Sequence, residues 1–173
     1  MDKEVLLKAK QGDKHSLGVI FDNYVDRLYR YAYVRLHDKH KAEDIVSTVF
    51  IKVIENIATL DLTKNFEAWL FTITRNSLID YLRKNKFVNA EEYISTAADK
   101  NSETKEVENS LIIKDIRSSM QGLKKVEQEV IELTYFAGLN DREVGELINV
   151  AEGNIRVIRF RAIKKIKKIM KIK

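Results

Sequence analysis

The sequence predicts an all-α protein made of two small helical domains joined by a flexible linker. Three observations lead to this fold class. Proline is absent from the 173 residues and glycine occurs only six times, so few residues would interrupt a helix. Large apolar residues recur at helical spacing over long stretches. Between residues 86 and 109 this periodicity stops, which divides the chain into two units.

The first unit, residues 1–85, is expected to contain four helices. A short helix over 2–11 leads into a longer one over 16–36, and a third follows over 40–57 after a polar turn. The apolar positions of the second and third helices are spaced three to five residues apart, which places them on one face. These positions are Leu17, Phe21, Tyr24, Leu28, Tyr31 and Leu36, then Ala42, Ile45, Val49, Val53 and Ile57.

The fourth helix is predicted over 66–85. Asn65 is a suitable N-cap because its side chain can accept a hydrogen bond from a free backbone N–H, and Glu67 favours the first turn. Its expected inward positions are Trp69, Leu70, Ile73, Leu78 and Leu82.

Residues 86–109 are rich in Ser, Thr, Asn and acidic residues, with six acids and three basic residues. This composition is typical of a solvated tether, and we expect a mobile linker.

The second unit, residues 110–173, is expected to contain helical segments over 110–123 and 124–138 and to end in a helix-turn-helix. Asn140 followed three residues later by Glu143 forms a capping box that starts a short helix. Residues 149–151 are short enough to be a tight turn, and Gly145 would let another helix cross closely. Such a motif places the N-terminal end of its second helix in the DNA major groove.

The last 23 residues contain nine basic residues and one acid. With Ile155, Ile158 and Ala162 facing inward, polar and basic side chains remain outside, where they can contact base edges and phosphates. A membrane-bound helix would also be basic and amphipathic, but would not need the capped partner helix. A solvated basic surface helix is the other alternative. The residues expected to contact DNA are Glu152, Asn154, Arg156, Arg159, Phe160, Lys164 and Lys167.

Several classes of protein are disfavoured. The apolar content of 45% is that of a globular protein, and the absence of cysteine excludes disulfides and thiolate metal sites. No Gly-rich phosphate loop or nucleophile motif occurs, and His15, His37 and His40 suit polar surface positions better than a metal site. We therefore expect no enzyme, cofactor or metal. With neither a signal peptide nor a stretch that could span a membrane, a cytoplasmic protein is expected.

Two longer segments carry a resemblance to a known family. The segments AEDIVSTVFIKVIENI and NFEAWLFTITRNSLIDYLRK resemble the first domain of bacterial RNA polymerase sigma factors of the extracytoplasmic-function (ECF) type. The segment VIELTYFAGLNDREVGELINVAEGNIRVIRFRA resembles their second domain. The resemblance implies a factor that binds core RNA polymerase and directs promoter recognition and transcription initiation. It also implies control by an anti-sigma protein.

The resemblance assigns a role to each unit. The helix over 40–57 would dock on the coiled coil of the largest polymerase subunit through Asp44, Ser47, Thr48, Phe50 and Lys52, with Ser47 and Thr48 standing where Gln and an acid are usual. The following loop and helix would contact the −10 promoter element, and the closing helix the −35 element. The implied −10 residues are Asn56, Thr59, Leu60, Asp61, Lys64, Phe71, Arg75, Asn76, Asp80, Arg83 and Lys84.

Alternatives remain at this point. Trp69 and Phe71 could pack in the core instead of meeting DNA. A helix-turn-helix regulator that is not a polymerase subunit would use residues 1–85 for dimerisation or sensing, but would not need the aromatic and basic helix over 66–84. A protein-interaction module, such as an anti-sigma partner, should lack the basic closing helix.

Overall fold

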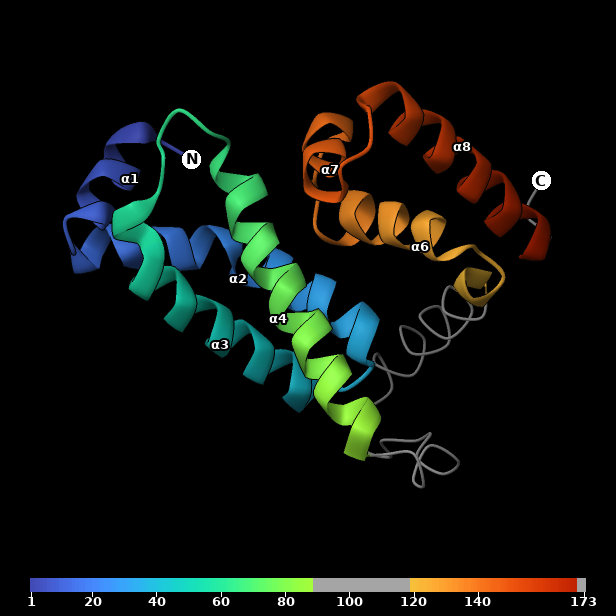
Figure 1. Ribbon diagram of the computed structural model, residues 1–173, viewed down its shortest axis with the longest axis horizontal. Coiled ribbons are helices and arrows are strands. Elements are labelled where there is room, and N and C mark those ends of the chain that lie inside the picture. Colours follow the sequence, from blue (N-terminus) through green and yellow to red (C-terminus); the bar gives the residue numbers. More distant parts are fainter. Residues whose placement is uncertain (89–118, 171–173) are drawn as a thin grey trace, which may run out of the picture.

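The computed structural model describes residues 1–88 and 119–170, and within these ranges all regular structure is helical (Figure 1). The predicted linker, apart from 86–88, and most of the expected helix over 110–123 lie outside the described residues. The first domain contains α1 (Lys3–Lys10), α2 (Lys14–Leu36), α3 (Lys39–Asn56), the 3₁₀ turn η1 (Ile57–Thr59) and α4 (Phe66–Val88). The four predicted helices of this unit are confirmed.

The helices of the first domain begin at side-chain caps. Asp2, Asp13 and Asp38 each accept a hydrogen bond from a backbone N–H in the first turn of α1, α2 and α3, at 2.8–3.0 Å. The predicted cap of α4 is confirmed, because Asn65 Oδ1 accepts from the backbone N–H of Glu67 at 2.8 Å. Each cap satisfies a donor that has no partner within its own helix.

The core of the first domain lies between α2, α3 and α4. All five expected inward residues of α3 are buried, as predicted. On α2 the expectation for Phe21 was wrong: Ile20 takes the buried position, and Phe21 is exposed beside Phe50. Leu82, expected inside on α4, is also exposed and lines a cavity between the domains.

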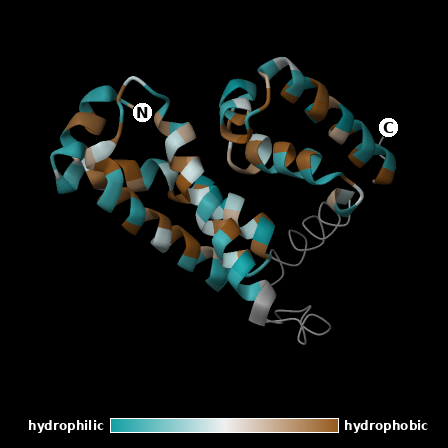
Figure 2. Ribbon diagram, in the orientation of Figure 1, coloured by the Kyte–Doolittle hydropathy of each residue, from teal (hydrophilic) through white to brown (hydrophobic). Residues whose placement is uncertain are grey.

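The second domain contains α6 (Lys125–Ile131), the π-helical turn η2 (Glu132–Phe136), α7 (Asp141–Ile148) and α8 (Glu152–Ile169). The helix expected over 124–138 therefore ends in a widened turn. Gly138 follows with a φ of 70°, a conformation that favours glycine. Apolar residues of α6 and α8 face each other across this domain (Figure 2).

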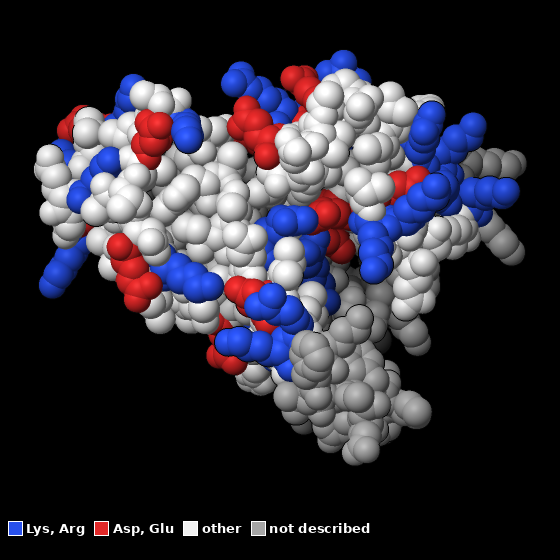
Figure 3. Space-filling view, in the orientation of Figure 1, with Lys and Arg blue, Asp and Glu red and all other residues white. Residues whose placement is uncertain are grey.

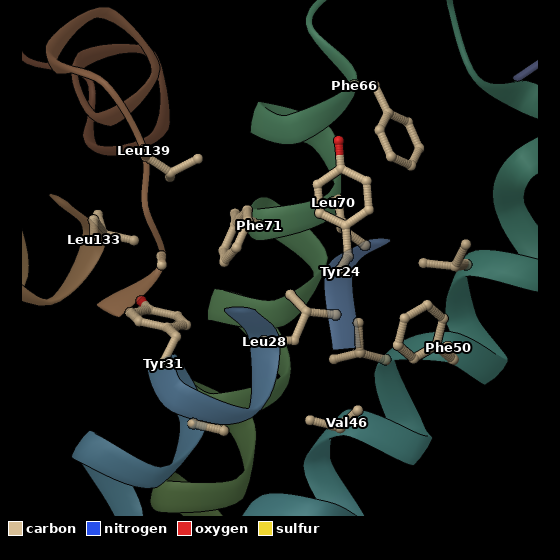
Figure 4. Packing of buried hydrophobic residues seen from close by; sticks show 14 of the residues in the cluster. Tyr24, Leu28, Tyr31, Val46, Phe50, Phe66, Leu70, Phe71, Leu133 and Leu139 are labelled. Atoms are coloured by element: carbon tan, nitrogen blue, oxygen red, sulfur yellow. The ribbon is translucent and has the colours of Figure 1, made fainter. Parts of the chain in front are cut away.

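One continuous apolar cluster joins the two domains. Tyr31 of α2 and Phe71 of α4 pack edge to face, with ring centroids 6.0 Å apart, and both are fully buried. Leu133 and Leu139 approach them from the second domain (Figure 4). The two domains are thus packed against each other rather than independent in this arrangement.

Candidate nucleic-acid and polymerase interfaces

The helix-turn-helix has the predicted geometry. The backbone N–H of Glu143 donates to Asn140 Oδ1 at 3.0 Å, and the N–H of Asn140 donates to Glu143 Oε2 at 2.9 Å, so the capping box is complete. The turn begins at Asn149, which adopts a left-handed conformation with a φ of 57°. A Cβ on Gly145 would lie 2.5 Å from the Val150 carbonyl oxygen, so only glycine allows the turn into α8 to approach α7 this closely.

The exposed face of α8 carries most of the residues predicted to contact the −35 element. Ile155 and Ala162 are fully buried, as expected, and Ile158 is half-buried. In Figure 3, Lys and Arg side chains gather over the part of the surface formed by α8. The exposed candidates are Glu152, Asn154, Arg156, Phe160, Lys164 and Lys167.

Arg159, also predicted to read bases, makes a contact within the protein in this structure. It is half-buried and donates a short hydrogen bond to Asp141 at the start of α7. Arg156 lies 3.6 Å from the same carboxylate and 3.4 Å from Glu152, but remains exposed. Asp141 thus ties α7 to α8 through Arg159 and forms a second, longer ion pair with Arg156.

The residues predicted to bind polymerase divide into two groups. Asp44, Ser47 and Thr48 are exposed on one face of α3. Phe50 is instead a core residue, with its ring 4.6 Å from that of Phe21, and Lys52 donates to Ser77 Oγ at 2.9 Å. Phe50 points inward because it follows Val46 and Val49 around the buried side of the helix.

Sequence reasoning missed two further residues on the exposed face of α3. Ile51 and Ile54 are 58% and 56% exposed, and their spacing from Ser47 places them on the same side of the helix. Ile51 and Ile54 are large apolar residues that do not belong to the predicted inward stripe of α3. This mismatch between apolar character and outward position is the signal that could have identified them.

The predicted −10 residues also divide between surface and core. Asn56 at the end of α3 and Thr59 at the end of η1 are exposed. Asp61 and Lys64 are exposed in the following loop, where Asp61 accepts a hydrogen bond from the N–H of Thr63 at 2.9 Å. On α4, Asn76, Arg83 and Lys84 are exposed and Asp80 is half-buried. Leu60 and Phe71 are buried, so we assign both to the core. Trp69 is half-buried and packs against Phe66.

An ion-pair network joins the domains beside the apolar cluster, and no pattern in the sequence predicted it. Arg35 Nε donates to Glu132 Oε2 at 2.6 Å, and Arg75 Nε donates to Glu129 Oε1 at 2.7 Å. Burial raises the pKa of the Glu132 carboxyl, although Arg35 opposes this shift. Arg75, a predicted −10 contact, is therefore held by an acid of the second domain.

A second set of polar contacts crosses the interface at the other end. Arg27 donates to the carbonyl oxygens of Ala137 and Gly138 at 2.7 and 3.2 Å, and to Glu67 at 2.7 Å. These carbonyl oxygens follow the last turn of η2 and have no backbone donor within the helix. The Arg27 guanidinium supplies the missing hydrogen-bond donors. Asn65 also donates to Glu143 at 3.1 Å.

Neither a metal site nor a membrane span is found among residues 1–88 and 119–170. In these ranges no three His, Asp or Glu side chains lie together as a metal ion would require. Likewise, none of the helices described there is both long and apolar enough to cross a membrane.

Comparisons with known proteins place this geometry in a family. Residues 20–88 match Sigma-70 region 2, and residues 119–168 match Sigma-70 region 4. The ECF RNA polymerase sigma factor SigW of Bacillus subtilis is 30% identical over 167 residues, covering 90% of this chain and 89% of SigW. The ECF sigma factor BldN of Streptomyces coelicolor is 28% identical over 171 residues, covering 96% of this chain but only 65% of BldN.

A solved structure, CnrH in complex with the cytosolic domain of CnrY, has the same fold, with a TM-score of 0.77 at 19% identity over 98% of this chain and 97% of CnrH. The chain belongs to the ECF-type RNA polymerase sigma factors, with α2–α4 in region 2 and the helix-turn-helix in region 4. It is a non-enzymatic factor that directs promoter recognition by RNA polymerase. The match to region 2 excludes the alternative of a regulator that is not a polymerase subunit.

Proposed function

We propose that this factor divides its task among three surfaces. The exposed face of α3 binds core RNA polymerase, the loop over 56–65 with α4 contacts the −10 element, and α8 contacts the −35 element. The observation that carries this proposal is the α3 face, where Asp44, Ser47 and Thr48 adjoin the exposed Ile51 and Ile54. Adjacent exposed apolar residues with a polar rim are typical of a protein interface.

The −10 surface fits an opened strand. Strand opening needs side chains that hold phosphates and unstacked bases by positive charge and hydrogen bonds. Lys64, Asn76, Arg83 and Lys84 are exposed and could do so. Arg75 could join them only by exchanging Glu129 for a phosphate.

The −35 surface fits duplex DNA. Arg156 and Asn154 lie near the N-terminal end of α8, where a helix-turn-helix meets base edges. Lys164 and Lys167 lie one or more turns further along and suit phosphates.

Two further proposals concern the cellular location of the protein and the partner that inhibits it. A factor that works on RNA polymerase acts in the cytoplasm. We also propose an anti-sigma partner, as the sigma factor RpoE from Bartonella quintana is seen in complex with the anti-sigma factor NepR. In this chain a cavity of about 550 Å³ between the domains, lined by Arg35, Arg75, Ile79 and Phe136, offers both charged and apolar contacts.

Charge reversal on α3 tests the polymerase surface. Asp44→Lys should weaken binding to purified core polymerase at least about tenfold, equivalent to about 1.4 kcal/mol. The reason is that it replaces a negative charge by a positive one in an interface whose charges are complementary. Ile51→Ser should weaken binding as well, by removing apolar contact. Asp44 and Ile51 are exposed, so circular dichroism should show unchanged helix content.

The matched control is Asp26→Lys on α2, a charge reversal at another exposed position, outside α3. It should bind core polymerase as the unaltered protein does. Equal affinity of the Asp44→Lys and Asp26→Lys proteins would place the docking surface elsewhere.

A further inference from the structure

An apolar ridge runs along the outward face of α8. Phe160 is 68% exposed and Val157 is 45% exposed. With Gly153 they are spaced four and three residues apart, which aligns all three on one side of the helix. We name Gly153, Val157 and Phe160 the outward ridge.

The outward ridge does not contribute to folding of the domain. The helix packs inward through Ile155 and Ala162, with Ile163 and Ile166 continuing that side toward α6. No atom lies within 4 Å of where a Cβ on Gly153 would be, so the first turn of the ridge is open to close approach. Two adjacent exposed apolar side chains on this basic helix are available to an apolar group of a binding partner.

Basic side chains flank the outward ridge on both sides. Arg156, oriented by Asp141 and Glu152, lies on one side, and Arg161 lies exposed on the other. Lys164 and Lys167 extend this basic surface toward the C-terminal half of α8. With Arg156 at a base edge and Arg161, Lys164 and Lys167 on phosphates, the ridge would lie in the groove against the base edges.

The major groove offers one apolar group on its base edges, the C5 methyl of thymine. We infer that Val157 and Phe160 read thymine methyl groups, and that the −35 element of this factor carries thymines, on either strand, opposite the outward ridge. This rests on the proposed entry of α8 into the major groove. The inference gives Val157, a residue outside the predicted DNA contacts, a role in selecting thymine.

The test removes single methyl groups from DNA. Duplexes that bind the full-length protein are first selected from a pool with a randomised segment. Each thymine of the selected duplex is then replaced in turn by deoxyuridine, which lacks only the methyl group. At one or more positions the unaltered protein should bind about fourfold more weakly, the change equal to about 0.8 kcal/mol for one buried methyl group.

Phe160→Ala and Val157→Ala supply the decisive comparison. Each should bind the thymine duplex more weakly and should lose the difference between thymine and deoxyuridine at its own position. Both residues are exposed, so the fold should be retained. The control, Lys167→Ala, should weaken binding to both duplexes alike and keep the fourfold ratio, because a phosphate contact is indifferent to sequence.

Two outcomes would overturn the inference, and only the second would also overturn the proposed −35 contact. Selective binding to the chosen duplex with no effect of deoxyuridine at any position would refute methyl reading and leave the −35 surface in place. Equal binding to selected and scrambled duplexes would refute the proposed −35 contact itself.

Discussion

Replacing Gly145 with alanine should unfold the helix-turn-helix. The added Cβ would lie 2.5 Å from the Val150 carbonyl oxygen and 3.5 Å from the Glu152 amide nitrogen. Because both neighbours are backbone atoms, no side-chain rotation relieves the clash, and the turn must move away from α7. That movement would pull the buried Ile155 out of the core.

We expect Gly145→Ala to lower the free energy of unfolding by about 3 kcal/mol, the upper part of the range for overpacked sites. Denaturant unfolding followed by circular dichroism measures this loss, and binding to −35 duplexes should disappear with it. The control is Gly18→Ala in α2, where an added Cβ would meet no atom within 4 Å. It should stabilise the protein by up to about 1 kcal/mol through helix propensity. A Gly145→Ala protein as stable as the Gly18→Ala protein would contradict the close approach of the turn to α7.

Replacing Arg35 with alanine should destabilise the closed arrangement of the two domains by about 3–5 kcal/mol at neutral pH, the loss typical of a broken buried ion pair. The Arg35 and Glu132 side chains are only 13% and 12% exposed, so the carboxylate would remain buried without its nearest cation. Arg83→Ala is the control, since it breaks a pair with Asp80 that lies at the surface. Its effect should stay within about 0.5 kcal/mol.

The effect of Arg35→Ala should depend on pH. Burial raises the pKa of Glu132 above its ordinary 4.5, so its contribution to stability is fully present below that value and is lost as the pH rises through the folded-state pKa. Removing Arg35 raises the pKa further, so the destabilisation should be largest at neutral pH and shrink as Glu132 becomes protonated. Glu129, Arg75 and Tyr31 also face this site and are unchanged in the variant. If Arg35→Ala lowered the free energy of unfolding equally at about pH 4 and pH 7, the cause would be lost packing rather than lost charge.

Local patterns in the sequence predicted the helices, their caps and the helix-turn-helix. The α3 stripe, the Asn65 cap and the Asn140–Glu143 box depend on residues within a few positions of one another, so spacing alone reveals them. Ile20 replaced Phe21 in the core because both fit a helical stripe and only the position of the neighbouring helices decides between them.

Contacts between the domains could not be predicted in this way. Phe71 looked like a DNA contact because its burial depends on Tyr31 and on Leu133 of the second domain (Figure 4). Arg75 and Glu129 are 54 positions apart, and no periodicity links them. The exposure of Phe160 was predicted from the spacing of α8, whereas Val157 was recognised as its exposed neighbour only once the inward side of α8 was known.

Transcription in vitro with purified core RNA polymerase tests the central claim most directly. Core polymerase with this protein should produce defined transcripts from a pool of genomic fragments of the source organism, and core polymerase alone should not. The Asp44→Lys protein should fail to support these transcripts, whereas the Asp26→Lys protein should support them fully. Identical transcripts with and without the folded protein would contradict its function as a sigma factor.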